Sequence, residues 1–428
     1  MLHLRMIVFA AVAGLLLVAA APVRAADTAS PNDTARFLAG MRPAADSPLA
    51  PLTNDRSWQQ HARTFDSAFG RIESRQLARI RAWSAKYLTN TRPTVFYMFS
   101  GPDYLYANAF FPNATTYILA GLEPVGTVPD LTMLRGAVGP NLHQLEASLS
   151  SILSYSFFIT KHMKSDLRSG RVNGTLPILY VFLARSGKTI REVTMVTLDD
   201  QGGVKPAAET SHGTAAHGVR IVFAGDDGEA RTLYYFSTNL ANDGIKSSHF
   251  LKFCETLAPA NSLIKSASYL PHSGGFSGVR DFLLANSAVL VQDDSGIPLV
   301  YYNAKRWDLR PFGRYLGPIG IFPGKYQSSY AALFRKSHPI DFGIGYRWRP
   351  NESNLLMAVR TSAEPGEPAP EASARSTPEE NGSESKSSQP SANKNAPARQ
   401  RRARTYEAQR ARSPFDWFRA MSPWGRSR

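Results

Sequence analysis

Cysteine is almost absent from this sequence. Cys254 is the only one among 428 residues, which rules out an intramolecular disulfide bond. Phe250, Phe253 and Leu257 accompany it at helical spacing, a pattern typical of a buried structural thiol rather than of a nucleophile. Without disulfide bonds the fold must depend on its hydrophobic core, which a hydrophobic fraction of 43% can supply at this length.

Long apolar runs are also scarce, and only residues 6–21 form one that approaches the length of a membrane span. A short basic segment, residues 1–5, precedes this run, and the small residues Val23 and Ala25 follow it, which is the order of an export signal. The run is slightly shorter than the ~20 residues of a membrane-spanning helix. We therefore predict a signal peptide over residues 1–25, a periplasmic or extracellular location, and a soluble mature chain with no transmembrane helix. An uncleaved membrane anchor is the alternative interpretation.

Complete motifs for nucleotide binding or catalysis are missing. Residues 186–189 resemble the end of a phosphate-binding loop, but Phe182 stands where the first glycine of that motif is required. Residues 275–278 approach a nucleophile elbow, but Val279 replaces its second glycine. The sequence therefore predicts no cofactor and leaves open whether the protein is an enzyme.

Metal-binding patterns are missing as well. His212 and His217 are close enough in sequence to coordinate one metal ion, but no matching carboxylate pattern accompanies them. They also lie in a glycine- and alanine-rich stretch, residues 201–218, that is typical of an exposed loop. We therefore predict no metal site.

Positive charge is abundant but unevenly distributed, with a formal net charge of +15. Residues 361–390 have six acidic and two basic residues, a net charge of −4, whereas residues 391–428 have ten basic and two acidic residues, a net charge of +8. The polar, proline-containing composition of residues 361–428 predicts a disordered low-complexity tail. We expect its basic end to bind an anionic envelope surface, and export argues against nucleic acid as the partner.

Alternating strand and helix patterns predict an α/β fold with a mixed sheet, long covering helices and added antiparallel hairpins. The expected strands cover residues 94–99, 115–120, 189–198, 219–224, 231–237, 263–270, 288–291, 298–302, 342–348 and 355–360. The expected helices cover residues 34–41, 55–88, 103–111, 140–167, 243–257 and 327–335, and residues 176–183 suit either state. The globular region should span residues 55–360 after a flexible segment of residues 26–54. A division into subdomains of 55–200 and 219–360 is left open.

A short pattern occurs twice in the chain. Residues 103–108 and 281–286 share an Asp, an aromatic residue, a Leu, one variable residue, an Ala and an Asn, in that order. Each copy lies between two apolar runs and suggests a strand, a turn, a short helix and a second strand. Neighbouring strands connected in this way favour parallel pairing through a crossover helix.

The two turns of this repeat are the candidate binding site. In open α/β sheets, ligands bind beyond the carboxyl ends of strands, where backbone N–H groups at a helix start favour anions. The candidate ligand-binding residues are Ser100, Gly101, Asp103, Glu123, His272, Gly274, Gly275, Ser277, Arg280, Asp281 and Asp293. Asp103 and Asp281 have a second interpretation, as acids that stabilise the start of a helix.

The sequence thus favours an exported protein that binds a small polar or anionic ligand at paired strand-to-helix turns. One alternative is a secreted serine-type hydrolase with Ser277 or Ser100 as nucleophile and His272 as base. Another is a non-catalytic envelope-associated interaction protein held by the basic tail.

Overall fold

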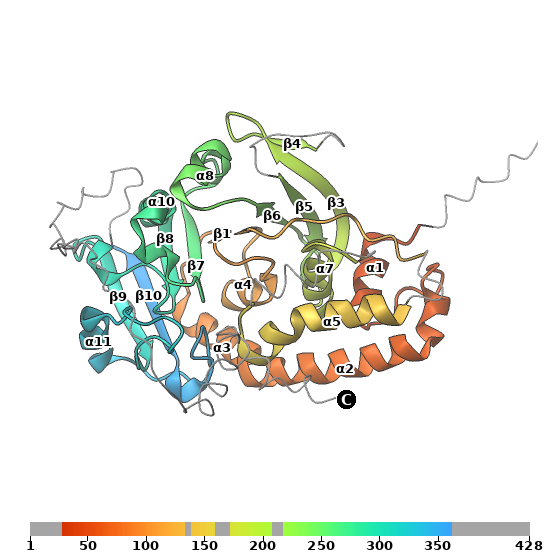
Figure 1. Ribbon diagram of the computed structural model, residues 1–428, viewed down its shortest axis with the longest axis horizontal. Coiled ribbons are helices and arrows are strands. Elements are labelled where there is room, and N and C mark those ends of the chain that lie inside the picture. The colour runs from red at the N-terminus through yellow and green to blue at the C-terminus, as the bar shows by residue number, and fades with distance from the viewer. Residues whose placement is uncertain (1–27, 133–137, 159–171, 208–216, 362–428) are drawn as a thin grey trace, which may run out of the picture.

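A ten-stranded mixed sheet forms the centre of the protein (Figure 1). The computed structural model describes residues 28–132, 138–158, 172–207 and 217–361. The strand order is β4-β3-β5-β6-β2-β1-β7-β8-β10-β9. The strands are β1 (Thr94–Tyr97), β2 (Thr116–Gly121), β3 (Thr189–Leu198), β4 (Val204–Pro206), β5 (His217–Ala224), β6 (Ala230–Ser237), β7 (Ala260–Ile264), β8 (Ser287–Gln292), β9 (Trp307–Gly313) and β10 (Asn354–Arg360). Strands β6, β2, β1, β7 and β8 are parallel to one another, and the outer strands pair antiparallel, which confirms the predicted α/β class.

The sheet is buried on both faces because its central strands are apolar on both sides. In β1, Val95 and Tyr97 belong to one hydrophobic core, while Phe96 belongs to the other, as the alternation of side chains in a strand requires. The first core packs under α1 (Pro31–Leu38), α2 (Arg56–Ile72), α3 (Ala78–Tyr87), α4 (Tyr104–Phe110), α5 (Val138–Tyr155) and α7 (Leu176–Arg185). The second core packs under α8 (Asn242–Ser247), α9 (Phe250–Glu255) and α10 (Ser277–Asn286), and α11 (Ser328–Leu333) lies beside β9.

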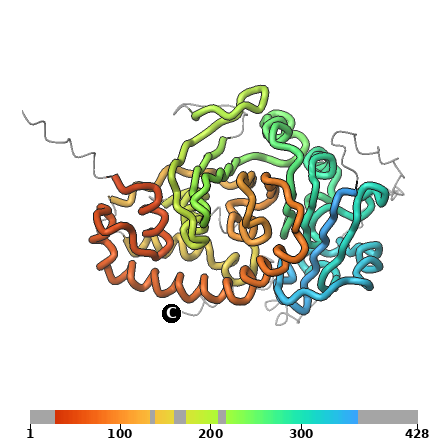
Figure 2. The backbone as a smooth tube through the Cα atoms, turned by 180° about the vertical axis from the view of Figure 1, so that it is seen from behind, coloured from red at the N-terminus to blue at the C-terminus, as the bar shows by residue number. Residues whose placement is uncertain are grey.

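The long amphipathic helix expected over residues 55–88 is confirmed as α2 and α3, joined by a π-helical turn at Glu73–Leu77. Asp55 begins it, since its side chain accepts hydrogen bonds from the backbone N–H groups of Ser57 and Trp58. Figure 2 shows this N-terminal part of the chain at one end of the molecule and the C-terminal strands at the other.

The N-terminal segment differs from its prediction. Residues 26–54 were expected to be flexible, but the described part forms α1 and a 3-10 helix (Ala50–Asn54). Phe37 and Leu38 of α1 are completely buried in the first core. The helix expected over residues 34–41 is thus found as α1, three residues earlier, whereas Phe37 and Leu38 gave too weak a pattern to indicate packing against the core.

The two copies of the repeated pattern form two β-α-β units, β1-α4-β2 and β7-α10-β8. The strands of each unit are parallel neighbours, as the crossover pattern predicted. From β1 the first unit continues to β2 on one side of the sheet's centre, and from β7 the second unit continues to β8 on the other side. Because such crossovers are right-handed, α4 and α10 must then cover opposite faces of the sheet. Accordingly, Leu105 of α4 lies in the first core and Leu283 of α10 in the second, with 3% and 1% of their surfaces exposed.

Several expected strands near the C-terminal end are wrong. Strand β7 stops at Ile264 instead of continuing to residue 270, and residues 298–302 contain the 3-10 helix Leu299–Tyr301. Residues 342–348 contribute only an isolated bridge. Strand β10 therefore pairs with β8 and β9 instead of with residues 342–348, and β8 pairs with β10 instead of with residues 298–302. Strand β9 was missed because Pro311 and Gly313 interrupt the alternation that begins at Trp307, and proline in a strand is tolerated mainly at the edge of a sheet, where β9 lies.

Two helical predictions also change in detail. Residues 176–183, which suited either state, are helical as part of α7. The helix expected over residues 243–257 divides into α8 and α9 at His249, whose φ of 58° does not fit a helix. Cys254 of α9 is buried, as predicted, and this burial raises the pKa of its thiol.

Some predictions concern residues outside the described part of the chain. These are the signal peptide, the low-complexity tail from residue 362, His212 and the end of the helix expected over residues 140–167. Within the residues that the structure does describe, no helix combines the length and the apolar character of a membrane span.

Candidate functional site

The carboxyl ends of the five parallel strands meet at one edge of the sheet. Strand pairing aligns Phe96 of β1 with Ser262 of β7, and Tyr97 of β1 with Leu119 of β2. The residues that follow the five strand ends are Met98, Leu122, Thr238, Lys265 and Asp293. Because β2 lies on one side of β1 and β7 on the other, the gap between β1 and β7 is the switch point at which open α/β sheets bind ligands.

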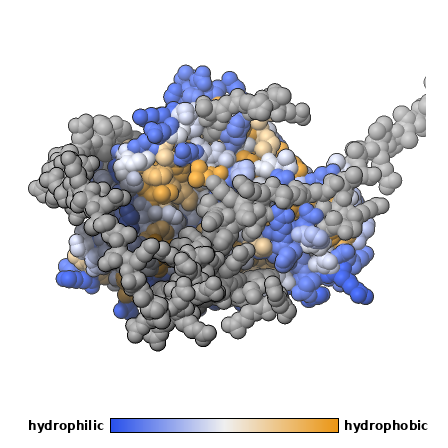
Figure 3. Space-filling view, viewed as in Figure 1, coloured by the Kyte–Doolittle hydropathy of each residue, from blue (hydrophilic) through white to orange (hydrophobic). Residues whose placement is uncertain are grey.

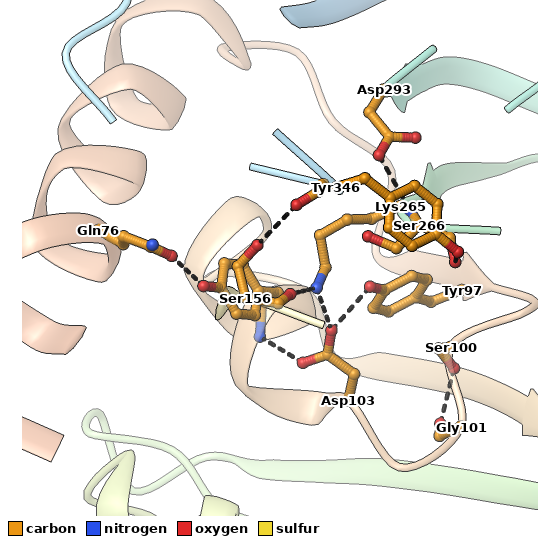
Figure 4. Close-up of polar contacts among 12 residues, drawn as sticks. Gln76, Tyr97, Ser100, Gly101, Asp103, Ser156, Lys265, Ser266, Asp293 and Tyr346 are labelled. Carbon is orange, nitrogen blue, oxygen red and sulfur yellow. Dashed lines mark hydrogen bonds and ion pairs between the residues drawn. The ribbon is translucent and has the colours of Figure 1, made fainter. Parts of the chain in front are cut away.

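A buried ion pair joins the loops after β1 and β7 (Figure 4). The ammonium nitrogen of Lys265 lies 2.9 Å from Oδ2 of Asp103, and their side chains are 1% and 3% exposed. The hydroxyl of Tyr97 donates a hydrogen bond of 2.8 Å to the same carboxylate oxygen. The other oxygen accepts a hydrogen bond of 3.2 Å from the backbone N–H of Tyr106 and so caps α4. The capping interpretation of Asp103 is therefore confirmed.

Lys265 has two further contacts that hold its side chain in place. Its ammonium group donates a hydrogen bond to the backbone carbonyl of Ser156 and lies 3.9 Å from the centre of the Tyr106 ring. The ring offers the cation the negative face of its π system. Contacts from Asp103, from Tyr106 of α4 and from Ser156 after α5 thus fix the cation at the switch point.

Burial is the main influence on the charges of this pair. It raises the pKa of Asp103, while the hydrogen-bonded Lys265 acts in the opposite direction. It lowers the pKa of Lys265, and Asp103 opposes that change. Each group therefore depends on the other to remain charged inside the protein.

Strained backbone is concentrated around the switch point. The described chain has six non-glycine residues with positive φ, and five of them border this region. These five are Phe99 (63°), Ser156 (74°), Ser266 (53°), Ser268 (51°) and Tyr269 (54°). Left-handed backbone at non-glycine residues costs free energy and is concentrated at functional sites in proteins.

Asp293, which follows β8, is hydrogen-bonded to the loop after β7. Its carboxylate accepts hydrogen bonds of 3.1 Å from the backbone N–H groups of Ser266 and Ser295. Burial, together with the neighbouring carboxylate of Asp294, raises the pKa of Asp293 to about 7. Gly345 packs against this carboxylate at a φ of 71°, and a Cβ atom there would lie 2.0 Å from Oδ2 of Asp293. Position 345 therefore requires glycine.

A small polar cavity of about 40 Å³ opens beside the ion pair. Its lining residues are Tyr97, Phe99, Ser100, Gly101, Asp103, Glu123, Phe157, Phe158, Lys265 and Ser266. The close approach of Gly121 shapes this cavity, because a Cβ atom at Gly121 would lie 2.4 Å from the Glu123 carboxylate and 2.9 Å from Cα of Gly101. A cavity of this size holds water molecules or a small polar group.

A larger hollow of about 130 Å³ adjoins the polar cavity, and the two share Phe99, Gly101, Glu123 and Ser266. Its other lining residues are Gly121, Leu122, Thr238, Asn239, Leu240, Ala267, Ser268, Leu270 and Phe276. The rings of Phe99 and Phe276 lie 5.9 Å apart, so the two turns of the repeat are in contact here.

Two hydroxyl groups that line these cavities have no hydrogen-bond partner among the described residues. They are Oγ of Ser266, a residue that lines both cavities, and Oγ1 of Thr238, a residue that lines the larger one. Both oxygen atoms are buried, although a buried hydroxyl normally finds a partner. Each is therefore a polar atom without a partner in the described chain, in a residue that lines a cavity.

Four of the predicted ligand-binding residues lie together at this site. Ser100, Gly101, Asp103 and Glu123 line the polar cavity, and Asp293 lies one layer behind it. The backbone N–H groups of Ser100 and Gly101 both donate to the carbonyl of Ala120. These donors are therefore already used, contrary to the anion-binding arrangement that the sequence suggested.

The other six predicted residues do not line either cavity. Gly274 and Gly275 are exposed, and His272, Ser277, Arg280 and Asp281 lie in or beside α10. Arg280 forms an ion pair of 3.1 Å with Asp281 and stacks 3.7 Å from the centre of the Tyr301 ring. Of the described residues 272–281, which form the second turn of the repeat, only Phe276 lines the larger hollow.

The predicted serine–histidine pair is not assembled in the described residues. Ser277 is hydrogen-bonded to the side-chain amide of Asn242 at 3.0 Å, and no hydrogen bond joins it to His272. Burial lowers the pKa of His272 to about 4, and Lys325 acts in the same direction. The geometry offers the hydrolase alternative no support.

Sequence reasoning missed Lys265, Ser266 and Tyr97. The available signal was a lysine directly after the buried strand Ala260–Ile264, followed by serine. The apolar residues Ala267 and Leu270 concealed it, because they extended the expected strand past its true end.

Comparisons with protein-family models, with curated proteins and with solved structures find no match for this chain. Among the residues that the structure describes, no group of three or more His, Cys, Asp or Glu side chains could hold a metal ion. The fold and the site therefore define the chain as an α/β protein with a polar cavity at the switch point of its parallel strands.

Proposed function

We propose that this chain is an exported protein that binds a small polar ligand in the cavity between the ends of β1 and β7. The observation that carries this proposal is the convergence of Ser100, Asp103, Glu123 and Ser266, from three strand ends, on one cavity at the switch point. The unpartnered hydroxyl of Ser266 adds a group that a ligand would satisfy.

The residues that line the cavity favour a neutral polar ligand over an anionic one. Among the described residues that line the cavity, Lys265 is the only Lys or Arg, and it already forms an ion pair with Asp103. The backbone donors of Ser100 and Gly101 are also occupied. An anion would therefore find no unneutralised cation among the described lining residues, whereas a neutral polar molecule needs only hydrogen bonds.

Ligand binding can be tested by thermal-shift screening of the purified protein against a library of polar metabolites. A ligand present at about 100 times its dissociation constant stabilises the folded state by about 2.7 kcal/mol. Hits should weaken in Ser266→Ala, which removes a hydroxyl without a protein partner, and should persist in the control Ser277→Ala, outside both cavities. If no metabolite shifts the wild-type protein, or if both variants respond alike, the proposed site is wrong.

Export is a separate part of the proposal and has its own test. The basic, apolar and small-residue order of residues 1–25 supports cleavage near Ala26. N-terminal sequencing of the protein recovered from the envelope or the medium should begin near that residue. Recovery of a chain that retains Met1 would contradict cleavage.

A further inference from the structure

The loop of residues 265–270, which follows β7, shapes both cavities at the switch point. Lys265 and Ser266 line the smaller cavity, and Ser266, Ala267, Ser268 and Leu270 line the larger one. The larger cavity reaches the surface, because its lining residue Leu122 is 54% exposed. Figure 3 shows hydrophobic surface in this area, beside α8 and α10. A change in the loop would therefore alter a site that is open to solvent.

The backbone of this loop is strained. Ser266, Ser268 and Tyr269 have φ values of 53°, 51° and 54°, in the left-handed region. Such a conformation costs free energy at a non-glycine residue, and it persists only where surrounding contacts determine it. The loop therefore depends on the groups that hold it.

The turn after β8, residues 293–295, supplies two of the contacts that hold the loop backbone. The N–H group of Ser266 donates a hydrogen bond of 3.1 Å to the carboxylate of Asp293. The N–H group of Ala267 donates a hydrogen bond of 2.8 Å to the hydroxyl of Ser295. Two successive loop residues are thus fixed by one short turn.

The next two residues of the loop are held as well. The hydroxyl of Tyr269 donates a hydrogen bond of 2.6 Å to the carboxylate of Asp294, which belongs to the same turn. The N–H group of Ser268 donates a hydrogen bond of 3.1 Å to the hydroxyl of Tyr346. Both carboxylates of the turn are therefore acceptors for the strained loop.

These two carboxylates are adjacent and buried. Asp293 and Asp294 are 1% and 4% exposed, and no ion pair of the described chain includes either of them. Burial and the charge of Asp294 raise the pKa of Asp293 to about 7, and burial also raises the pKa of Asp294. Two adjacent buried carboxylates disfavour a second negative charge, so the pair retains a proton at mildly acid pH.

The other described groups that face the pair do not supply a matching positive charge. Lys265 is paired with Asp103, and Arg347 donates hydrogen bonds to the backbone carbonyls of residues 317–318. Burial lowers the pKa of His272 to about 4, which leaves its ring neutral above pH 5. Burial raises the pKa of each tyrosine that faces the pair, so these side chains stay neutral too: Tyr97, Tyr269, Tyr315, Tyr330 and Tyr346.

From this geometry we propose that Asp293 and Asp294 form a proton-dependent clamp on residues 265–270, which holds the loop of the binding site firmly while the pair retains a proton and less firmly once that proton is lost. This inference rests on the proposed function and adds to it a regulation of the same site by pH.

The direction of the effect follows from proton binding. In the closed loop Asp293 keeps its proton up to a pH of about 7, whereas in an opened, hydrated loop its pKa returns toward the ordinary value of 3.8. Between these values the closed form binds a proton that the opened form has lost. The closed form should therefore lose stability by about tenfold per pH unit as pH rises toward 7, and the loss should end above that pH.

Hydrogen exchange of the full chain, followed by mass spectrometry between pH 5 and pH 8, measures this opening. Each exchange rate is divided by the rate of an unstructured peptide at the same pH. The amides of residues 266–268 should lose about tenfold in protection per pH unit up to about pH 7 and then level off. They should also exchange faster at every pH than the amides of residues 262–264 in β7, because only the loop opens.

Matched variants assign the effect to the clamp. Asp293→Asn keeps the shape of the side chain without its charge, and it should remove most of the dependence on pH. Asp294→Asn removes the neighbouring charge that helps to raise the pKa of Asp293, so protection should level off at a lower pH. The control Asp46→Asn changes an exposed carboxylate, and it should behave like the wild-type protein.

The clamp is wrong if protection of the loop does not change with pH, if Asp293→Asn keeps the wild-type slope, or if the loop and β7 are equally protected, since the opening would then be global. The proposed function can fail separately. A polar metabolite that binds in a Ser266-dependent manner while loop protection ignores pH would overturn the clamp alone. Loop protection that follows pH as expected, without any metabolite that binds, would overturn the proposed function and leave the clamp as a property of the loop.

Discussion

The carboxylate of Asp103 and the ammonium group of Lys265 form a 2.9 Å ion pair that joins the two central loops of the protein inside its core. Asp103 follows β1 and Lys265 follows β7, so the pair connects the two halves that diverge from the middle of the sheet. The same pair forms one wall of the polar cavity. The stability of the fold and the shape of the cavity therefore depend on shared residues.

Removing one member of this pair should destabilise the fold strongly. Asp103→Asn or Lys265→Met leaves a buried charge without its partner, at a cost of about 3–5 kcal/mol. The double variant Asp103→Asn/Lys265→Met should recover most of that loss. Urea denaturation measures these changes, with Asp308→Asn as control, because the exposed pair of Asp308 and Arg310 contributes only about 0–1 kcal/mol. A double variant no more stable than either single variant would contradict this coupling.

The raised pKa of Asp293 should make stability depend on pH. Its pKa is about 7 in the folded protein against an ordinary value of 3.8, so between these values the folded state retains a proton that the unfolded state has lost. The free energy of unfolding should therefore fall as pH rises from about 4 to about 7. Asp293→Asn should flatten this slope, whereas Asn in place of the exposed Asp46 should not. Melting temperatures measured across this pH range decide the matter, and parallel slopes in all three proteins would refute the prediction.

The two leucines of the repeated pattern should contribute equally to stability. Leu105 and Leu283 are both almost completely buried, one in each core, so Leu105→Ala or Leu283→Ala should cost about 2–5 kcal/mol. Because the sheet separates them, the costs should add in the double variant. Chemical denaturation of the three variants provides the measurement. A loss below about 1 kcal/mol at either site would show that the sites are not equivalent core positions.

The basic tail should be responsible for adhesion to anionic surfaces. Deletion of residues 391–428 removes a net charge of +8, so binding to anionic lipid vesicles at low salt should disappear while the melting temperature is unchanged. Sedimentation with vesicles at low and high salt measures this binding. Full-length protein that remains in the supernatant at low salt would exclude the tail as an anchor.

Local pattern was sufficient to predict much of the fold. The helical spacing of Trp58, Phe65 and Phe69 identified α2, because a long apolar stripe at this spacing is characteristic of a helix with one face against a core. The turn after β1 was also found, since Pro102 and Asp103 are typical of a helix start.

The second half of the site could not be predicted in the same way. Ala267, Tyr269 and Leu270 are apolar, yet they lie in irregular backbone after β7, where packing rather than strand pairing holds them. Lys265 is almost completely buried, which lysine rarely is, and Asp103, distant in the sequence, supplies the opposite charge that this position needs. Such pairings between remote segments leave no periodic signal in the sequence.

The position of β1 in the middle of the sheet has a consequence for how the protein is made. A chain that emerges from its amino terminus presents β1 and β2 long before β7, and until then one edge of β1 has no partner. The site also needs Gly345, near the end of the described chain, to pack against Asp293. The cavity is therefore completed late, and a nascent or truncated chain would expose an unpaired strand edge in its place.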